Sequence, residues 1–136
     1  MSSLKWDKRL ETGISKIDDQ HREIFKRIDD LELAILNCKE KAELVRVIEF
    51  LEWYVVEHFD AEEKIMMDLH YPEFSKHYEA HKQFRSMCKE LARECMNKGV
   101  DQYLALETEK ELRKWWENHI LRSDMSFVPY VKKEKK

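Results

Sequence analysis

Glycine and proline are almost missing from this sequence: each occurs twice in 136 residues. Tight hairpin turns depend on these residues, whereas 39% of the chain is Asp, Glu, Lys or Arg, which long helices tolerate well. The composition therefore disfavours a β-sheet architecture and predicts an all-α protein. With 43% hydrophobic residues the chain is long enough to build one core, and we expect residues 1–136 to form a single domain.

The sequence also lacks paired cysteines, a long apolar run and a large net charge. The number of cysteines is odd, and Cys38, Cys88 and Cys95 form no C-x-x-C motif, so a disulfide framework or a zinc ribbon is disfavoured. We expect the cysteines to be small core-compatible residues of a protein in a reducing cytoplasm. No stretch approaches the roughly 18 apolar residues of a membrane span, and the N-terminus has no signal-peptide core. A net charge of −3 gives no attraction for nucleic acid, and we expect the basic tail at 132–136 to be a solvated end.

Four long segments carry apolar residues in steps of three and four, the spacing of a helix with one buried face. Asp18 or Asp19 is the predicted N-cap of the first helix, Pro72 precedes the third, and Gly99 follows it. The predicted helices span about 18–37, 41–67, 73–97 and 101–121. Because their connections are short, we expect an antiparallel up-down-up-down four-helix bundle. The first 14 and last dozen residues are expected to be arms, with Trp6 anchoring the N-terminal arm over the bundle.

Five of the six histidines lie on these stripes, where leucine is expected, and one of them alone would be interpreted as a satisfied core residue. The polar stripe residues are His21, His58, Glu62, His77, His81 and His119. His70 lies off the stripes, in the predicted turn LHYP, where a surface role is expected. Burying six polar groups without partners costs about 6–18 kcal/mol. The net stability of a whole domain is about 5–15 kcal/mol, so this cost would consume it. Such a core needs a bound partner.

A metal ion is the natural partner, because imidazole nitrogen is a good ligand for Fe, Zn, Cu and Ni. The stretch HYEAH lacks the H-E-x-x-H order of zinc proteases, and the two Glu-x-x-His motifs of ferritin-like proteins do not occur at matching positions. Five histidines with carboxylate oxygen exceed a four-coordinate zinc site and are enough for two metal ions. We therefore predict a dinuclear site, with iron as the metal.

Helix phase decides among the carboxylates near His58. Only Glu62 lies four residues from His58 on the same stripe, so Glu57 and Glu63 are expected to face water.

Helix phase alone does not decide whether the Asp124 side chain reaches the metal site. Asp124 follows His119 by five residues, an offset that leaves the helical face. Asp124 therefore reaches the site only if the fourth helix has ended or bent by Ser123.

The arrangement of these motifs resembles the hemerythrins, specifically the stand-alone bacteriohemerythrins. The resemblance covers nearly the whole chain, from Trp6 and Gly13 to Asp124. The motifs that carry it are DDQH, HFDAEE, YPEFSKHYEAH and WENHILRSD. Five histidines, one glutamate and one aspartate in this order and spacing form a highly specific signature.

The resemblance implies a four-helix bundle around two iron ions (Fe2+ or Fe3+), joined by an oxo or hydroxo bridge, that bind O2 reversibly. Carried over by position, one iron has His77, His81 and His119, the other has His21 and His58, and Glu62 and Asp124 bridge both. Counted in this way, the three-histidine iron has six ligands and the two-histidine iron has five. One position therefore stays open for O2.

Reversible binding requires an apolar wall beside that open position. The predicted wall residues are Phe59, Trp115 and Ile120, although ordinary core packing would account for each equally well. The facing of Trp53 and Trp116 is left open.

We expect an O2-binding protein for storage, delivery or buffering, not an enzyme, with O2 as its partner and neither nucleic acid nor membrane. The alternatives are a di-iron enzyme acting on peroxide or nitric oxide, and an O2 or redox sensor.

Overall fold

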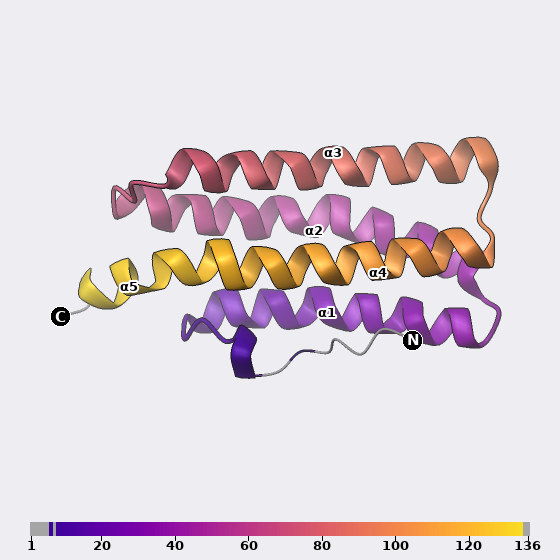
Figure 1. Ribbon diagram of the computed structural model, residues 1–136, viewed down its shortest axis with the longest axis horizontal. Helices are drawn as coiled ribbons and strands as arrows, with labels where there is room; N and C mark the ends of the chain where they lie inside the picture. The colour runs from indigo at the N-terminus through magenta and orange to yellow at the C-terminus, as the bar shows by residue number, and fades with distance from the viewer. Residues whose placement is uncertain (1–5, 7, 135–136) are drawn as a thin grey trace.

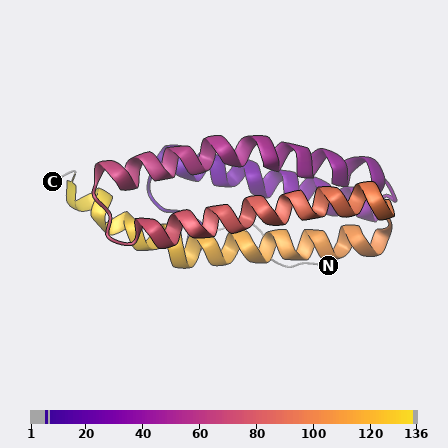
Figure 2. The same cartoon turned by 90° about the horizontal axis from the view of Figure 1, so that it is seen from above.

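The computed structural model describes Trp6 and residues 8–134. A short 3-10 helix, η1 (Lys8–Leu10), precedes the bundle. The bundle helices are α1 (Ser15–Leu36), α2 (Glu40–Asp68), α3 (Phe74–Lys98) and α4 (Gln102–Asn118), and α4 continues through the π-helix η2 (His119–Asp124) into α5 (Met125–Glu134). The four long helices lie side by side in alternating directions (Figures 1 and 2). Helix α1 contacts α2 and α4, and α2 contacts α3. The predicted all-α, antiparallel four-helix bundle is confirmed.

Most helix ends lie where the sequence predicts them. Gly99 ends α3 with a φ of +78°, in the left-handed region that suits glycine, and the Asp101 side chain caps α4 by accepting a hydrogen bond from the Leu104 amide at 2.7 Å. His70, in the turn between α2 and α3, is exposed with a φ of +54°. The main difference at the C-terminal end is that residues 125–134 form a helix instead of a trailing arm. Residues 135–136 of the expected basic end lie outside the described residues.

The predicted N-cap of α1 is wrong. The helix begins at Ser15, and Asp18 lies inside it with 5% exposure. Its carboxylate accepts hydrogen bonds from the Thr12 amide and hydroxyl, both at 2.8 Å, and from the Gly13 amide at 3.1 Å. Asp18 therefore holds the preceding loop against the helix, and this longer-range use of its carboxylate cannot be told from local capping by sequence.

The apolar stripes form a continuous core. The apolar residues at steps of three and four on the first two helices are buried: Ile24, Ile28, Leu31 and Ile35 on α1, and Leu44, Ile48, Leu51 and Val55 on α2. Ile65, which continues the spacing on α2, is half-buried. Trp6 packs against this core, with its ring 5.8 Å from Phe25, as expected for an anchored N-terminal arm. Cys88 is in the core and Cys95 is half-buried, but Cys38 is exposed in a turn, so the expectation of a core role was wrong for Cys38.

The antiparallel order brings one end of every helix to the same level. Helix α1 begins there, α2 ends, α3 begins, and α4 passes into η2. His21 lies early in α1, His58 late in α2, His77 early in α3, and His119 at the start of η2, so that all four point into one layer of the bundle. No helix in the described part of the chain is long and apolar enough to cross a membrane.

Candidate metal centre

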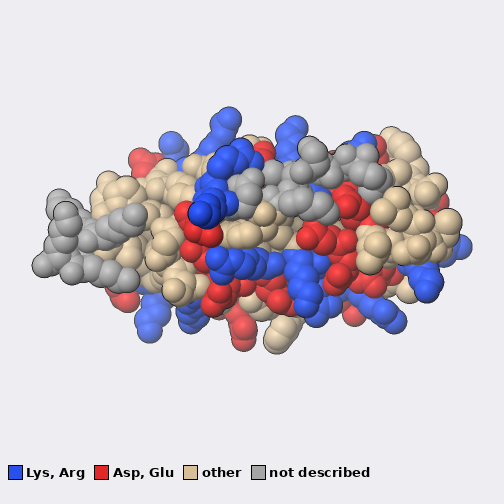
Figure 3. All heavy atoms as spheres, turned by 90° about the horizontal axis from the view of Figure 1, so that it is seen from below, with Lys and Arg blue, Asp and Glu red and all other residues tan. Residues whose placement is uncertain are grey.

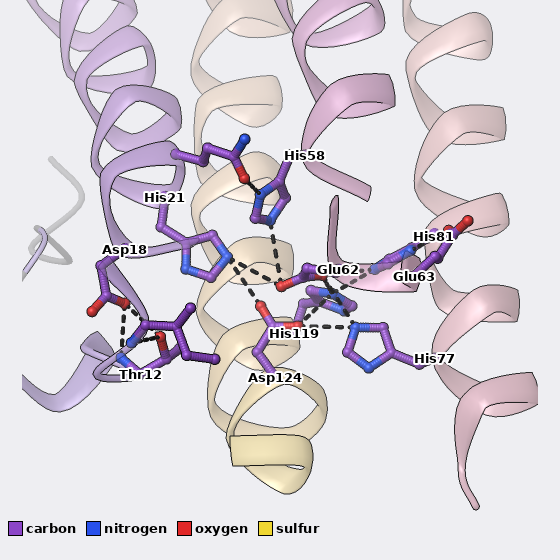
Figure 4. A network of polar contacts seen from close by, with 12 residues as sticks. Thr12, Asp18, His21, His58, Glu62, Glu63, His77, His81, His119 and Asp124 are labelled. Carbon is purple, nitrogen blue, oxygen red and sulfur yellow. Dashed lines mark hydrogen bonds and ion pairs between the residues drawn. The ribbon is translucent and has the colours of Figure 1, made fainter. Parts of the chain in front are cut away.

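Seven polar side chains meet in this layer of the bundle (Figure 4). All are at most 4% exposed, and the two carboxylates are fully buried. They form two groups that share both carboxylates. One group is Glu62, His77, His81, His119 and Asp124, and the other is His21, His58, Glu62 and Asp124. The structure thus brings together every residue that the sequence nominates as a ligand, including Asp124.

Glu62 turns one oxygen to each group. Its Oε1 lies 3.1 Å from the Nε2 of His81 and 3.3 Å from the Nε2 of His77. Its Oε2 lies 3.5 Å from the Nε2 of His58 and 3.7 Å from the Nε2 of His21. A carboxylate that divides its two oxygens in this way is placed to bridge two ions.

Asp124 repeats the pattern from the opposite side. Its Oδ1 lies 2.9 Å from the Nε2 of His77 and 3.2 Å from that of His119, while its Oδ2 lies 3.0 Å from the Nε2 of His21. All five imidazoles therefore present the same ring nitrogen, Nε2, to the centre of the layer.

The donor atoms fit a pair of metal ions better than they fit one another. The Nε2 atoms of His81 and His119 lie 3.2 Å apart, although two unprotonated imidazole nitrogens gain nothing from facing each other. Ligand atoms about 2.1 Å from one ion and at right angles around it are about 3 Å apart, which matches the spacing here. Several inward atoms also have no partner in hydrogen-bond geometry: the Nε2 of His21 and of His58, the Oε2 of Glu62, and both oxygens of Asp124.

A π-helix places Asp124 in the site. In an α-helix, residues five apart point about 140° away from each other. Between His119 and Asp124 the chain instead forms π-type turns, whose hydrogen bonds join residues five apart and so stack these two side chains on one face. The condition that the fourth helix must have ended or bent by Ser123 is met, because α4 ends at Asn118, although the chain then continues through η2 into α5.

Without metal, the layer holds protons between its imidazoles and carboxylates. Burial lowers the pKa of His119, but Asp124 and Glu62 outweigh this effect and raise the pKa to about 10. The same balance raises the pKa of His77 to about 8, whereas burial lowers the pKa of His58 to about 3. For Glu62, burial raises the pKa, but the surrounding imidazoles, with His58 foremost, hold it well below its usual value. Metal binding would have to displace the protons on His77 and His119.

Two imidazoles have acceptors for their outward nitrogen, Nδ1. The Nδ1 of His58 lies 2.8 Å from the Oε1 of Gln20, and the Nδ1 of His81 lies 2.8 Å from the Oε2 of Glu63. The expectation that Glu63 faces water is wrong, since its side chain is only 14% exposed and reaches from α2 to α3. Glu57 is exposed as predicted.

Aromatic rings surround the imidazoles. Phe59 is fully buried and stacks on His81, with centroids 3.7 Å apart and an angle of 7°. Trp115 is half-buried and stacks on His119 at 4.6 Å. Trp116, whose facing the sequence left open, is fully buried, with its ring 5.7 Å from His58 and 6.0 Å from His21.

Comparison with known proteins gives a consistent result. Residues 12–131 match the family model described as "Hemerythrin HHE cation binding domain". The chain is 35% identical to a bacteriohemerythrin of Pseudomonas aeruginosa (strain LESB58), over 97% of this chain and 84% of that protein. It is 28% identical to a myohemerythrin of Theromyzon tessulatum, over 90% of this chain and 89% of that protein. A crystal structure of wild-type hemerythrin superposes with a TM-score of 0.81 at 26% identity, covering 96% of this chain and 98% of that one. The chain belongs to the hemerythrin family.

Family membership confirms the cofactor and the function that the sequence resemblance implied. Hemerythrins bind O2 at a non-haem di-iron centre, and this chain has a buried cluster of histidine and carboxylate side chains suited to that centre.

Proposed function

We propose that the chain binds O2 reversibly, for storage, delivery or buffering, at a di-iron centre whose ligands are the seven clustered side chains. His77, His81 and His119 hold one ion, His21 and His58 hold the other, and Glu62 and Asp124 bridge the pair. The observation that carries the assignment is the division of both carboxylates, each of which turns one oxygen toward the three-histidine group and the other toward the two-histidine group.

The difference in imidazole number determines where the gas binds. When bound, the two iron ions supply the redox chemistry by which O2 is taken up and given back. The group of His21 and His58 offers one imidazole fewer than the other group, so an ion held there keeps room for an external ligand. The protein's own part is to hold five Nε2 atoms and two carboxylates in a fixed, dry arrangement.

The wall of the proposed O2 pocket is apolar. Phe59 and Ile120 are fully buried in the same layer, and we add Trp116 because its ring contacts both His21 and His58. Trp115 stays a predicted wall residue, although it stacks on His119 in the other group. The indole nitrogen of Trp116 is buried without a hydrogen-bond partner. An indole N–H donates a hydrogen bond but gives up no proton near neutral pH, which favours binding over turnover.

A carrier with no catalytic role, confined to the cytoplasm, is the form of this function that we propose. The mixed surface charge supports a protein without nucleic-acid partners: on the face in Figure 3, basic and acidic side chains lie side by side. We further propose that residues 1–136 act as one domain. An enzyme acting on peroxide or nitric oxide at the same centre is the alternative that the test below distinguishes.

The test is gas exchange by the anaerobically reduced, iron-loaded protein. We expect a visible absorption band that appears when O2 is added and disappears when it is removed, over repeated cycles. A single irreversible change, with consumption of added peroxide, would favour the enzyme. Replacing His77 with Asn should reduce the iron content, whereas His70→Asn, at an exposed turn position with the left-handed φ that Asn tolerates, should retain it.

A further inference from the structure

The two groups of ligands differ in what holds their imidazoles from outside. His81, in the three-histidine group, has the carboxylate of Glu63 at its Nδ1, and His58, in the two-histidine group, has the amide oxygen of Gln20. Both distances are 2.8 Å, so the two contacts are matched in length and differ in charge. Because Nε2 of each ring faces the centre, Nδ1 must carry the proton and donate it to the acceptor.

We propose that this difference adds to the inequality that ligand number already creates between the two metal positions, with Glu63 as the positioning residue that supplies the added part. A carboxylate acceptor makes the ligating imidazole a stronger donor than a neutral amide does. The ion held by His81 is therefore stabilised in its higher oxidation state relative to the ion held by His58. This inference rests on the proposed ligand assignment.

Burial strengthens the effect of Glu63. The His81 side chain is fully buried, and the Glu63 side chain is 14% exposed, so the carboxylate acts on the ring through a medium of lower dielectric constant than water. Glu63 is the next residue after Glu62 on α2. Glu62 contacts the Nε2 of His81 through its Oε1, and Glu63 contacts the Nδ1, so α2 supplies both the inward and the outward partner of this ring.

Arg85 limits the charge that Glu63 delivers. Its Nη2 lies 3.8 Å from the Glu63 carboxylate, and its guanidinium sits 5.7 Å from the centre of the Phe59 ring, which in turn stacks on His81. A partly exposed cation at this distance withdraws part of the negative charge from the hydrogen bond to His81. Removing Arg85 should therefore act in the opposite direction from removing the charge of Glu63.

The consequence is a defined order of oxidation. When ferricyanide removes one electron from the diferrous protein and becomes ferrocyanide, the electron should come from the ion on the His81 side. An ion held by His21 and His58 would then stay ferrous. The charge of Glu63 thus protects the oxidation state of the ion that has room for a gas ligand.

Isosteric variants test the proposal on the metal-free chain. Co2+ titration of the wild-type protein should show two binding steps. Glu63→Gln keeps an acceptor oxygen for His81 and removes only the charge, and it should weaken the tighter step by about 10- to 100-fold while leaving the other unchanged. Gln20→Glu should strengthen the weaker step, and the double swap should exchange both effects.

A second readout uses the reduction potential of the iron-loaded protein. Glu63→Gln should raise the potential for removal of the first electron, and Arg85→Gln should lower it. Shifts of opposite sign in the two variants would show that charge is responsible. If both substitutions merely loosened the packing, they would change the Co2+ affinity and the reduction potential in the same direction as each other. Two Co2+ steps that are both unmoved by Glu63→Gln would overturn the inference and leave the proposed function intact. A chain that never binds two Co2+ ions would overturn the ligand assignment, and the inference with it.

Discussion

Removing the metal is expected to cost a large part of the stability of this fold. The metal-free layer leaves five inward atoms without hydrogen-bond partners: the Nε2 of His21 and of His58, the Oε2 of Glu62, and the two oxygens of Asp124. At about 1–3 kcal/mol for each buried unsatisfied group, the penalty is about 5–15 kcal/mol. A whole domain is stabilised by about the same amount. Protonation of His77 and His119 offsets part of the penalty, so we take the lower end, about 5 kcal/mol.

Thermal unfolding measures this loss. At about 4 °C per kcal/mol for a chain of this length, the midpoint of the chelated protein should lie about 20 °C below that of the anaerobic, iron-loaded protein. Calorimetry under argon, with circular dichroism to follow helix content, gives both midpoints. Re-addition of Fe2+ should restore the higher value, as ligand linkage requires. Midpoints within about 3 °C of each other would show that the buried polar layer is satisfied without metal, and the reasoning would fail.

The pocket wall, the thiols and the protons of the metal-free layer each give a further test. Phe59→Ala should keep its iron, because Phe59 contributes no ligand, but should oxidise faster in air than the parent; an unchanged oxidation rate would rule out its role in the wall. In the folded protein at pH 8, exposed Cys38 should react first with a thiol reagent, and Cys88 only after unfolding, since burial raises the pKa of Cys88 to about 12; equal rates would contradict the burial. Loading the apoprotein with Zn2+ should release about two protons at pH 7 and fewer at pH 9. At pH 9 the His77 imidazole, with a pKa of about 8, has already lost its proton, whereas the His119 imidazole, with a pKa of about 10, still carries one. A release that does not change over this range, measured with an indicator dye in weak buffer, would contradict these pKa directions.

Helical periodicity was enough to predict the bundle and the six polar residues on its stripes. Each of these residues lies at a step of three or four from buried neighbours, so an α-helical phase puts it in the core without knowledge of the tertiary fold. His21 and Glu62 are fully buried for this reason. The same reasoning identified His70 as a turn residue, since it lies off every stripe.

The rest of the site depends on features that α-helical phase does not describe. Asp124 enters the layer through π-type turns, and the sequence HILRSD carries no signal that distinguishes these turns from an α-helix. Glu63 was expected to face water because periodicity locates the start of a side chain and not its end, which here reaches His81 on the next helix. The facing of Trp116 was left open, and only the packing shows that its ring is fully buried while Trp115 is half-buried.

O2 uptake per iron distinguishes a reversible di-iron carrier from every alternative. The reduced protein should be loaded anaerobically, its iron content determined, and its O2 uptake and release followed with an oxygen electrode alongside the visible spectrum. We expect two iron ions per chain and one O2 bound per pair, recovered as O2 when the gas is removed. One metal ion per chain, or O2 that is consumed and never recovered, would contradict it.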